Sequence, residues 1–174
     1  THDGKARFVP ISPKAPPVPL TANHPLRLNT GRVRDHWHTL TRTGRSQRLS
    51  RHTDEPYVQV HPADAERADL VPGGIARITS RKGQVLARVR VDTDQRPGSL
   101  FVPIHWSDTF ALRARVSTLI PAHADPLSGQ PESKTTPVNI TPYRPRWFGL
   151  LLSRNEVDIG SDMAYWAKAK GDES

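Results

Sequence analysis

Residues 75–91 read Ile-Ala-Arg-Ile-Thr-Ser-Arg-Lys-Gly-Gln-Val-Leu-Ala-Arg-Val-Arg-Val, and this stretch decides the fold class. Two runs rich in β-branched residues, 75–80 and 84–91, flank the turn signal Arg81-Lys82-Gly83, so the pattern predicts a β-hairpin. In the second run, valine and alanine alternate with arginine. This alternation predicts a strand with one buried face and one solvated face.

Further short strands are expected on both sides of the hairpin. They are residues 26–29, 57–60, 100–102 and 138–140. A short helix is expected from His61, because Pro62 suits an early helical position and Pro72-Gly73-Gly74 ends the helix. Five or six short strands with one or two short helices indicate a mainly β domain, either a small barrel or a sandwich. The order of the elements favours closure into a barrel over a parallel α/β sheet.

The two ends of the chain are expected to lie outside a central domain of residues 26–142. Residues 1–25 carry five prolines between positions 13 and 25, which exclude a helix and predict an extended lead-in, with a short edge strand at Phe8-Val9-Pro10-Ile11. Residues 143–174 are expected to form an irregular tail that either packs on the barrel or reaches toward a missing neighbour, and the pattern at 162–170 favours a helix that carries Tyr165 and Trp166. The first residue is Thr1 rather than Met, which suggests a fragment or a processed chain.

The composition excludes several classes of protein. The chain has no cysteine, so disulfides, a thiol nucleophile, iron–sulfur ligation and cysteine-based zinc sites are excluded. The sequence contains no run of 18 apolar residues, so no membrane-spanning helix is predicted. The net charge of +8 is concentrated near the N-terminus, since residues 1–50 contain nine Lys or Arg and two acids. This local excess indicates an anionic partner, either a phosphate-rich cofactor or a nucleic acid.

The basic excess coincides with a polar loop expected over residues 32–54. Directly before it, Thr30-Gly31-Arg32 reads as a turn in which glycine allows backbone N–H groups to approach phosphate and arginine offers a planar fork. An ordinary turn is the alternative. His36-Trp37-His38-Thr39 follows, with a tryptophan suited to a flat ligand and hydroxyls suited to phosphate or ribose. The two histidines lack a third ligand at an obvious spacing, so hydrogen bonding is favoured over metal binding.

Two later clusters add candidate ligands. His105 and Trp106 follow the end of a predicted strand, and Lys134 ends a turn-rich loop before the last strand. Lys134 either reaches an anion or belongs to a solvated loop. No phosphate-binding loop, paired-glycine dinucleotide fingerprint or nucleophile elbow is present, so the sequence predicts no catalytic residue. Nucleic-acid binding is not favoured, because the arginine-rich stretch lacks helical periodicity and has one aromatic residue.

Four stretches in this order, residues 28–39, 60–65, 101–106 and 125–134, closely resemble the C-terminal molybdopterin-dinucleotide-binding domain of bacterial molybdenum oxidoreductases. The match looks nearest to assimilatory nitrate reductase, with formate dehydrogenase as a cousin. The resemblance implies a six-stranded double-psi β-barrel that binds bis(molybdopterin guanine dinucleotide) with molybdenum. It also implies a cytoplasmic enzyme that reduces nitrate to nitrite, of which this fragment alone is inactive.

The resemblance carries over to individual positions. A family asparagine falls at Ser117, whose single shorter hydroxyl departs from the family pattern. The metal ligand and the iron–sulfur cluster belong to other parts of the enzyme, so the partners are the cofactor and the remaining domains. The cofactor-binding residues that the motifs imply are Thr30, Gly31, Arg32, Val33, His36, Trp37, His38, Thr39, His105, Trp106, Ser117 and Lys134.

Overall fold

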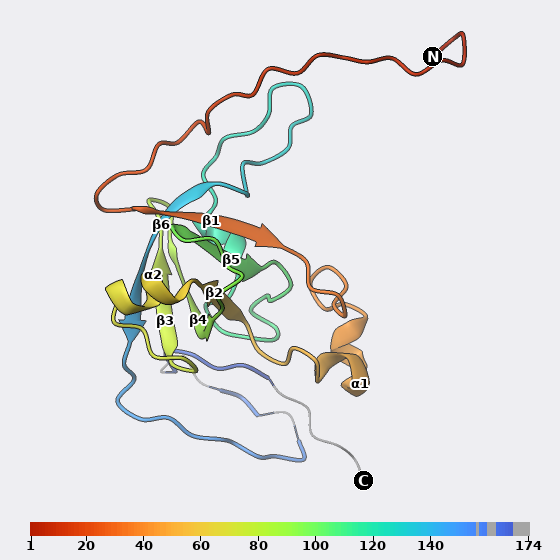
Figure 1. The fold of residues 1–174 in the computed structure, drawn as a ribbon. Helices are drawn as coiled ribbons and strands as arrows, with labels where there is room; N and C mark the ends of the chain where they lie inside the picture. The colour runs from red at the N-terminus through yellow and green to blue at the C-terminus, as the bar shows by residue number, and fades with distance from the viewer. Residues whose placement is uncertain (156, 160–162, 169–174) are drawn as a thin grey trace.

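The computed structural model describes residues 1–155, 157–159 and 163–168, and its centre is a closed barrel of six strands (Figure 1). The strands are β1 (Leu26–Gly31), β2 (Tyr57–Val60), β3 (Ile75–Thr79), β4 (Gln84–Val91), β5 (Ser99–Pro103) and β6 (Thr136–Tyr143). The described helices are short: η1 (Thr43–Arg45), α1 (Gln47–Ser50), α2 (Pro62–Arg67) and η2 (Val116–Leu119). The prediction of a mainly β chain is confirmed.

The barrel closes in the order β1-β5-β2-β4-β3-β6. Two of its pairings are parallel, β1 with β5 and β2 with β4, and the remaining four are antiparallel. Each parallel pair joins strands that are far apart in the chain, so the connections between them must cross over the barrel. This arrangement is the double-psi β-barrel, as expected.

Alternation along β4 explains how the barrel is filled. Val85, Ala87 and Val89 are buried in the main core, whereas Arg88 and Arg90 lie on the outer face, as predicted. The expected hairpin is also present, with Thr79 opposite Gln84 across the turn. Burial of the branched side chains from all six strands supplies most of the driving force that closes the barrel.

Strand β1 is longer than the sequence predicted. The turn expected at Thr30-Gly31 is wrong, because β5 pairs with β1 as far as Gly31, which lies opposite Pro103. Gly31 packs against a ring at this point, since a Cβ added there would lie 2.8 Å from Phe101 Cε2. Glycine is therefore needed at Gly31 for close packing inside the sheet.

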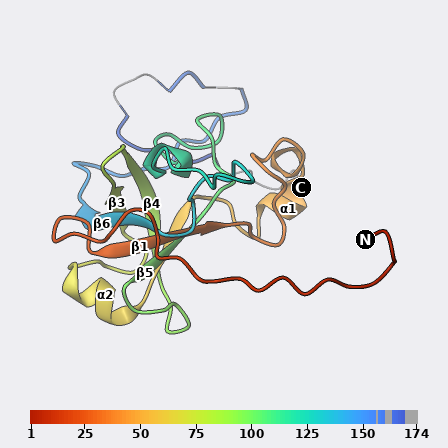
Figure 2. The ribbon, with the colours of Figure 1, turned by 90° about the horizontal axis from the view of Figure 1, so that it is seen from above.

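The edge strand expected at residues 8–11 is wrong. Residues 1–20 run as extended chain away from the barrel (Figures 1 and 2), and Phe8 is 96% exposed. A strand needs a partner for its backbone groups, and among the described residues none pairs with this segment. No helix in the described part of the chain is long and apolar enough to cross a membrane.

The helix expected over residues 162–170 is wrong for residues 163–168, which are not helical. Their backbone instead forms a β-bridge that joins Ala167 to Ala111. Backbone groups committed to a neighbouring segment are no longer available for a helix. Positions 162, 169 and 170 lie outside the described residues.

Candidate functional site

The β1–β2 connection (residues 32–56) leaves the end of β1 and is more ordered than a polar loop. It contains η1 and α1, and it buries Leu40, Thr43 and Gly44. His38 and Leu40 have positive φ angles of 42° and 64°. Non-glycine residues in this left-handed region are strained, and such strain persists only where the surrounding structure imposes it.

His105 holds this connection in place from inside the protein. Its side chain is fully buried, its Nε2 accepts the Val33 N–H at 2.9 Å, and its Nδ1 donates to the His38 carbonyl at 2.6 Å. Because an N–H only donates and a carbonyl only accepts, the ring is neutral and carries its proton on Nδ1. Burial lowers the pKa of His105, and the hydrogen bond to the His38 carbonyl offsets part of this shift. Both nitrogens of His105 therefore fix the backbone of the connection.

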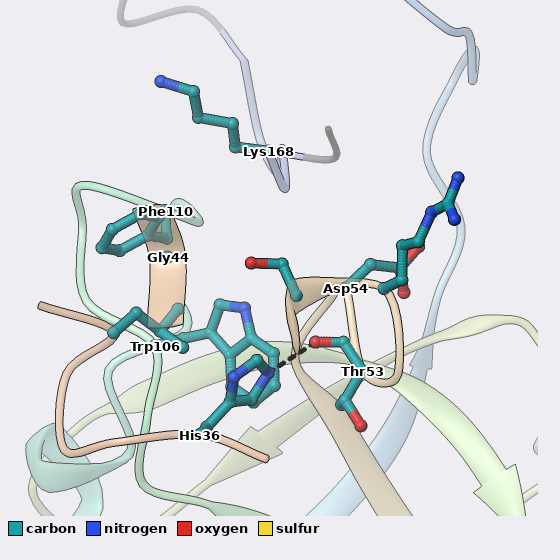
Figure 3. Close-up of a pocket in the computed structure, with 10 residues that line it drawn as sticks. His36, Gly44, Thr53, Asp54, Trp106, Phe110 and Lys168 are labelled. Atoms are coloured by element: carbon teal, nitrogen blue, oxygen red, sulfur yellow. Dashed lines mark hydrogen bonds between the residues drawn. The ribbon is translucent and has the colours of Figure 1, made fainter. Parts of the chain in front are cut away.

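His36 forms a second internal support. The Trp37 N–H donates to the Thr43 hydroxyl at 3.3 Å, and that hydroxyl contacts His36 Nδ1 at 3.3 Å. His36 Nε2 then donates to the Thr53 carbonyl at 2.6 Å, and the ring lies edge-on to Trp106 at 5.4 Å (Figure 3). These bonds agree with the hydrogen-bonding interpretation for His36. The described residues hold no group of three or more His, Cys, Asp or Glu that could bind a metal.

The outer side of the connection presents polar and aromatic groups to solvent. Arg32, His38 and Thr39 are exposed, and Trp37 is 47% exposed with its ring edge-on to His38 at 4.5 Å. Arg42 lies over the Trp37 ring at 5.8 Å. The sequence did not single out Arg42, because the stretch contains six arginines and their spacing marks none of them as the partner of Trp37. A flat anionic ligand finds both an aromatic face and cations here.

The loop before β6 closes over the end of β1. Lys134 Nζ donates to the Thr30 carbonyl, and the Thr30 hydroxyl donates to the Ser133 carbonyl at 2.9 Å. The structure therefore brings together two predicted site residues that are 104 positions apart. Ser117 is exposed on η2, which packs beside β4, and its carbonyl accepts the Ile120 N–H.

Charge on the β1–β2 connection is strongly biased. Its 25 residues include six arginines and three acids. Asp35 is paired with Arg34 at 2.9 Å and with His52 at 2.8 Å, and the Arg34 hydrogen bond lowers the pKa of Asp35 to about 2. Arg32 is exposed and pairs with no acidic side chain among the described residues. The surface near the end of β1 is consequently suited to phosphate.

A pocket lies behind the connection, where it meets the segment that follows β5 (Figure 3). His36, Gly44, Trp106 and Phe110 line it, and Lys168 comes from the far end of the chain. A Cβ added at Gly44 would lie 2.7 Å from the Phe110 ring. Sequence reasoning missed Gly44 and Phe110, since their contact joins segments that carry no shared pattern.

A closed barrel with a basic, aromatic connection that is fixed from within belongs to the class of domains suited to a phosphate-bearing ligand. Residues 26–137 match the family described as "Molydopterin dinucleotide binding domain", and the chain belongs to this family. The predicted family is thereby confirmed. In nitrate reductase relatives, membership implies molybdopterin guanine dinucleotide with molybdenum as the cofactor.

Similar proteins agree with this assignment. The chain is 49% identical over 167 residues to a nitrate reductase of Klebsiella oxytoca, covering 96% of this chain and 19% of that protein. It is 32% identical over 144 residues to the assimilatory nitrate reductase catalytic subunit of Bacillus subtilis, covering 81% of this chain and 20% of that protein. The chain thus spans about a fifth of the length of these relatives.

A solved structure supports the fold alone. Acetylene hydratase from Pelobacter acetylenicus superposes with a TM-score of 0.59 at 15% sequence identity. The match covers 68% of this chain and 18% of that protein.

Proposed function

We propose that this chain is the cofactor-binding domain of a molybdenum-dependent nitrate reductase, and that the β1–β2 connection holds bis(molybdopterin guanine dinucleotide). The observation that carries the proposal is the exposed Arg32, which directly follows β1 and is the first residue of the connection that His105 fixes. The residues present fit the cofactor, because the exposed face combines cations with a tryptophan and the buried face supplies only structural bonds.

The candidate residues divide into two groups. One group is exposed or half-buried and would contact the cofactor: Gly31, Arg32, Val33, Trp37, His38, Thr39, Ser117 and Lys134. The other group is buried and would hold the first in position: Thr30, His36, His105 and Trp106. Arg32 would form charge-assisted bonds with phosphate, and Trp37 would stack on a flat ring.

The whole enzyme would carry out a two-electron reduction. The cofactor, when bound, would supply the two-electron oxygen-atom transfer that converts nitrate to nitrite, with electrons from an iron–sulfur cluster in other domains. Residues 26–142 would be the cofactor-binding unit, residues 1–25 the lead-in and residues 143–174 the link to a further module. The isolated chain would be inactive, and the enzyme would be cytoplasmic, as the relation to an assimilatory enzyme suggests.

The test is a titration of the 174-residue chain with GDP, followed by tryptophan fluorescence. Saturable quenching is expected, and Arg32→Ala should weaken binding by at least about tenfold, since a hydrogen bond to a charged group contributes about 1.5–3 kcal/mol. Arg96→Ala, an exposed arginine in the turn before β5, is the matched control. Equal affinity of both variants would refute the role of Arg32.

A parallel titration with a short DNA duplex at the same salt concentration separates the two anionic partners. A response to the duplex with none to GDP would favour a nucleic-acid-binding barrel. Assays of the whole enzyme with nitrate and with formate then separate the two substrates that the family resemblance allows.

A further inference from the structure

The C-terminal strap (residues 163–168) pairs with residues 110–112, which lie in the segment that follows β5. The Leu112 N–H donates to the Trp166 carbonyl and the Lys168 N–H donates to the Phe110 carbonyl, both at 2.9 Å. These two bonds flank the bridge between Ala111 and Ala167. The strap therefore adds a short β-pairing to a segment that also accepts the Leu86 N–H of β4 at the Arg113 carbonyl, at 2.8 Å.

A second contact ties the strap to the barrel. The Tyr165 hydroxyl donates to Glu55 Oε2 at 3.3 Å, and burial raises the pKa of Tyr165. Glu55 also accepts two bonds from Arg88 of β4, at 2.9 Å and 3.0 Å. Arg88 in turn donates to the Gly73 carbonyl at 2.8 Å. The strap thus reaches both the last residues of the β1–β2 connection and a strand of the barrel.

The strap also packs against the middle of the β1–β2 connection. Ala167 packs against a small core made of Leu40, Trp106, Ala111 and Ala114. Leu40 belongs to the connection and has a positive φ. Lys168 and Gly44 both line the pocket (Figure 3).

We infer that the C-terminal strap holds the β1–β2 connection in the conformation that receives the cofactor, so that Tyr165, Ala167 and the Lys168 backbone are positioning elements of the site. The part that concerns the cofactor rests on the proposed function. The connection needs such support, because η1 and α1 are too short to be stable by themselves. Its two left-handed residues also persist only under tertiary restraint.

The test compares two variants of the 174-residue chain at one position. Lys168→Pro removes the N–H that bonds to Phe110, whereas Lys168→Ala removes the side chain and keeps that N–H. Hydrogen exchange is followed at the Leu40 and Gly44 amides, which donate within the connection at 2.9 Å each. The Val89 amide, bonded to the Gly74 carbonyl at 2.8 Å, reports on the barrel.

Exchange at Leu40 and Gly44 should be at least about tenfold faster in Lys168→Pro than in Lys168→Ala, with no change at Val89. Equal exchange in both variants would overturn the inference. If Lys168→Pro also accelerates hydrogen exchange at the Val89 amide, Tyr165→Phe is used in its place. This variant loses only the hydroxyl bond to Glu55. Unchanged exchange at the Leu40 amide in Tyr165→Phe would also overturn the inference.

A GDP titration of the same variants separates this inference from the proposed function. Weaker binding by Lys168→Pro than by Lys168→Ala supports the positioning role. Faster loop exchange without GDP binding by any form of the chain would reject the proposed function while supporting the strap. Normal GDP binding with identical affinity in both variants would overturn the positioning role.

Discussion

Replacing His105 with phenylalanine tests the internal support of the β1–β2 connection. His105→Phe keeps a flat ring in a fully buried site but removes the acceptor of the Val33 N–H and the donor to the His38 carbonyl. Each lost hydrogen bond costs about 0.5–1.5 kcal/mol, and a group left unsatisfied in a buried place costs about 1–3 kcal/mol. Because Val33 is only half-buried and His38 is exposed, water replaces part of the loss. We expect the free energy of unfolding to fall by about 2–4 kcal/mol.

The pH dependence of stability provides a second reading of the same side chain. Burial lowers the pKa of His105 in the folded protein, while in the unfolded chain it lies near about 6.5. Below that pH the unfolded chain binds a proton that the folded chain resists, so stability is full above the unfolded pKa. The contribution of His105 to stability decreases as the pH falls below the unfolded pKa, and it stops decreasing once the pH is below the folded pKa. His105→Phe should lack this component.

Urea unfolding at pH 7.5 and pH 5.5, followed by tryptophan fluorescence, measures both effects. His2→Phe, in the exposed lead-in, is the control. The reasoning is refuted if the His105 variant keeps the free energy of unfolding of the wild type within about 0.5 kcal/mol, or if its stability falls between the two pH values as much as that of the wild type.

Two further substitutions test the packing of the barrel. Gly31→Ala places a methyl group 2.8 Å from the Phe101 ring, so thermal unfolding should show that the free energy of unfolding falls by about 1–3 kcal/mol. Adding Phe101→Leu should restore part of this loss. An unchanged free energy of unfolding would contradict the packing described for β1. Asp64→Ala removes the buried carboxylate that accepts the Gly98 N–H at 2.6 Å, and urea unfolding should show a loss of about 1–3 kcal/mol. An unchanged midpoint would mean that Gly98 finds another acceptor.

Local patterns account for what the sequence predicted correctly. The alternation along β4 and the turn before it depend on neighbours in the chain, and both are found. The end of β1 depends on β5, more than 70 positions away, so the turn expected at residues 30–31 was wrong. The helix expected at the C-terminus failed for the same reason, since its backbone pairs with residues 110–112.

The candidate site was predictable only in part. The polar and aromatic character of residues 32–39 was visible in the sequence, and the structure exposes Trp37 and Arg32 as a ligand would require. The role of His105 was not visible, because it requires Val33, 72 positions away, to reach its Nε2. Residue type indicates which chemistry a side chain can perform. Whether a given histidine makes internal hydrogen bonds or faces a ligand depends on contacts that only the closed barrel creates.

The pairing of β1 also governs when the domain can form during synthesis. The neighbours of β1 are β5 and β6, so Leu28 meets Leu100 on one side and Thr136 on the other. The β3–β4 hairpin forms from residues that are close together in the chain. Strand β1 cannot pair with both of its neighbours until more than 100 further residues have left the ribosome. Such non-local closure makes folding slow and leaves strand edges open to other nascent chains. Chaperone binding to nascent chains should therefore persist until β6 has emerged.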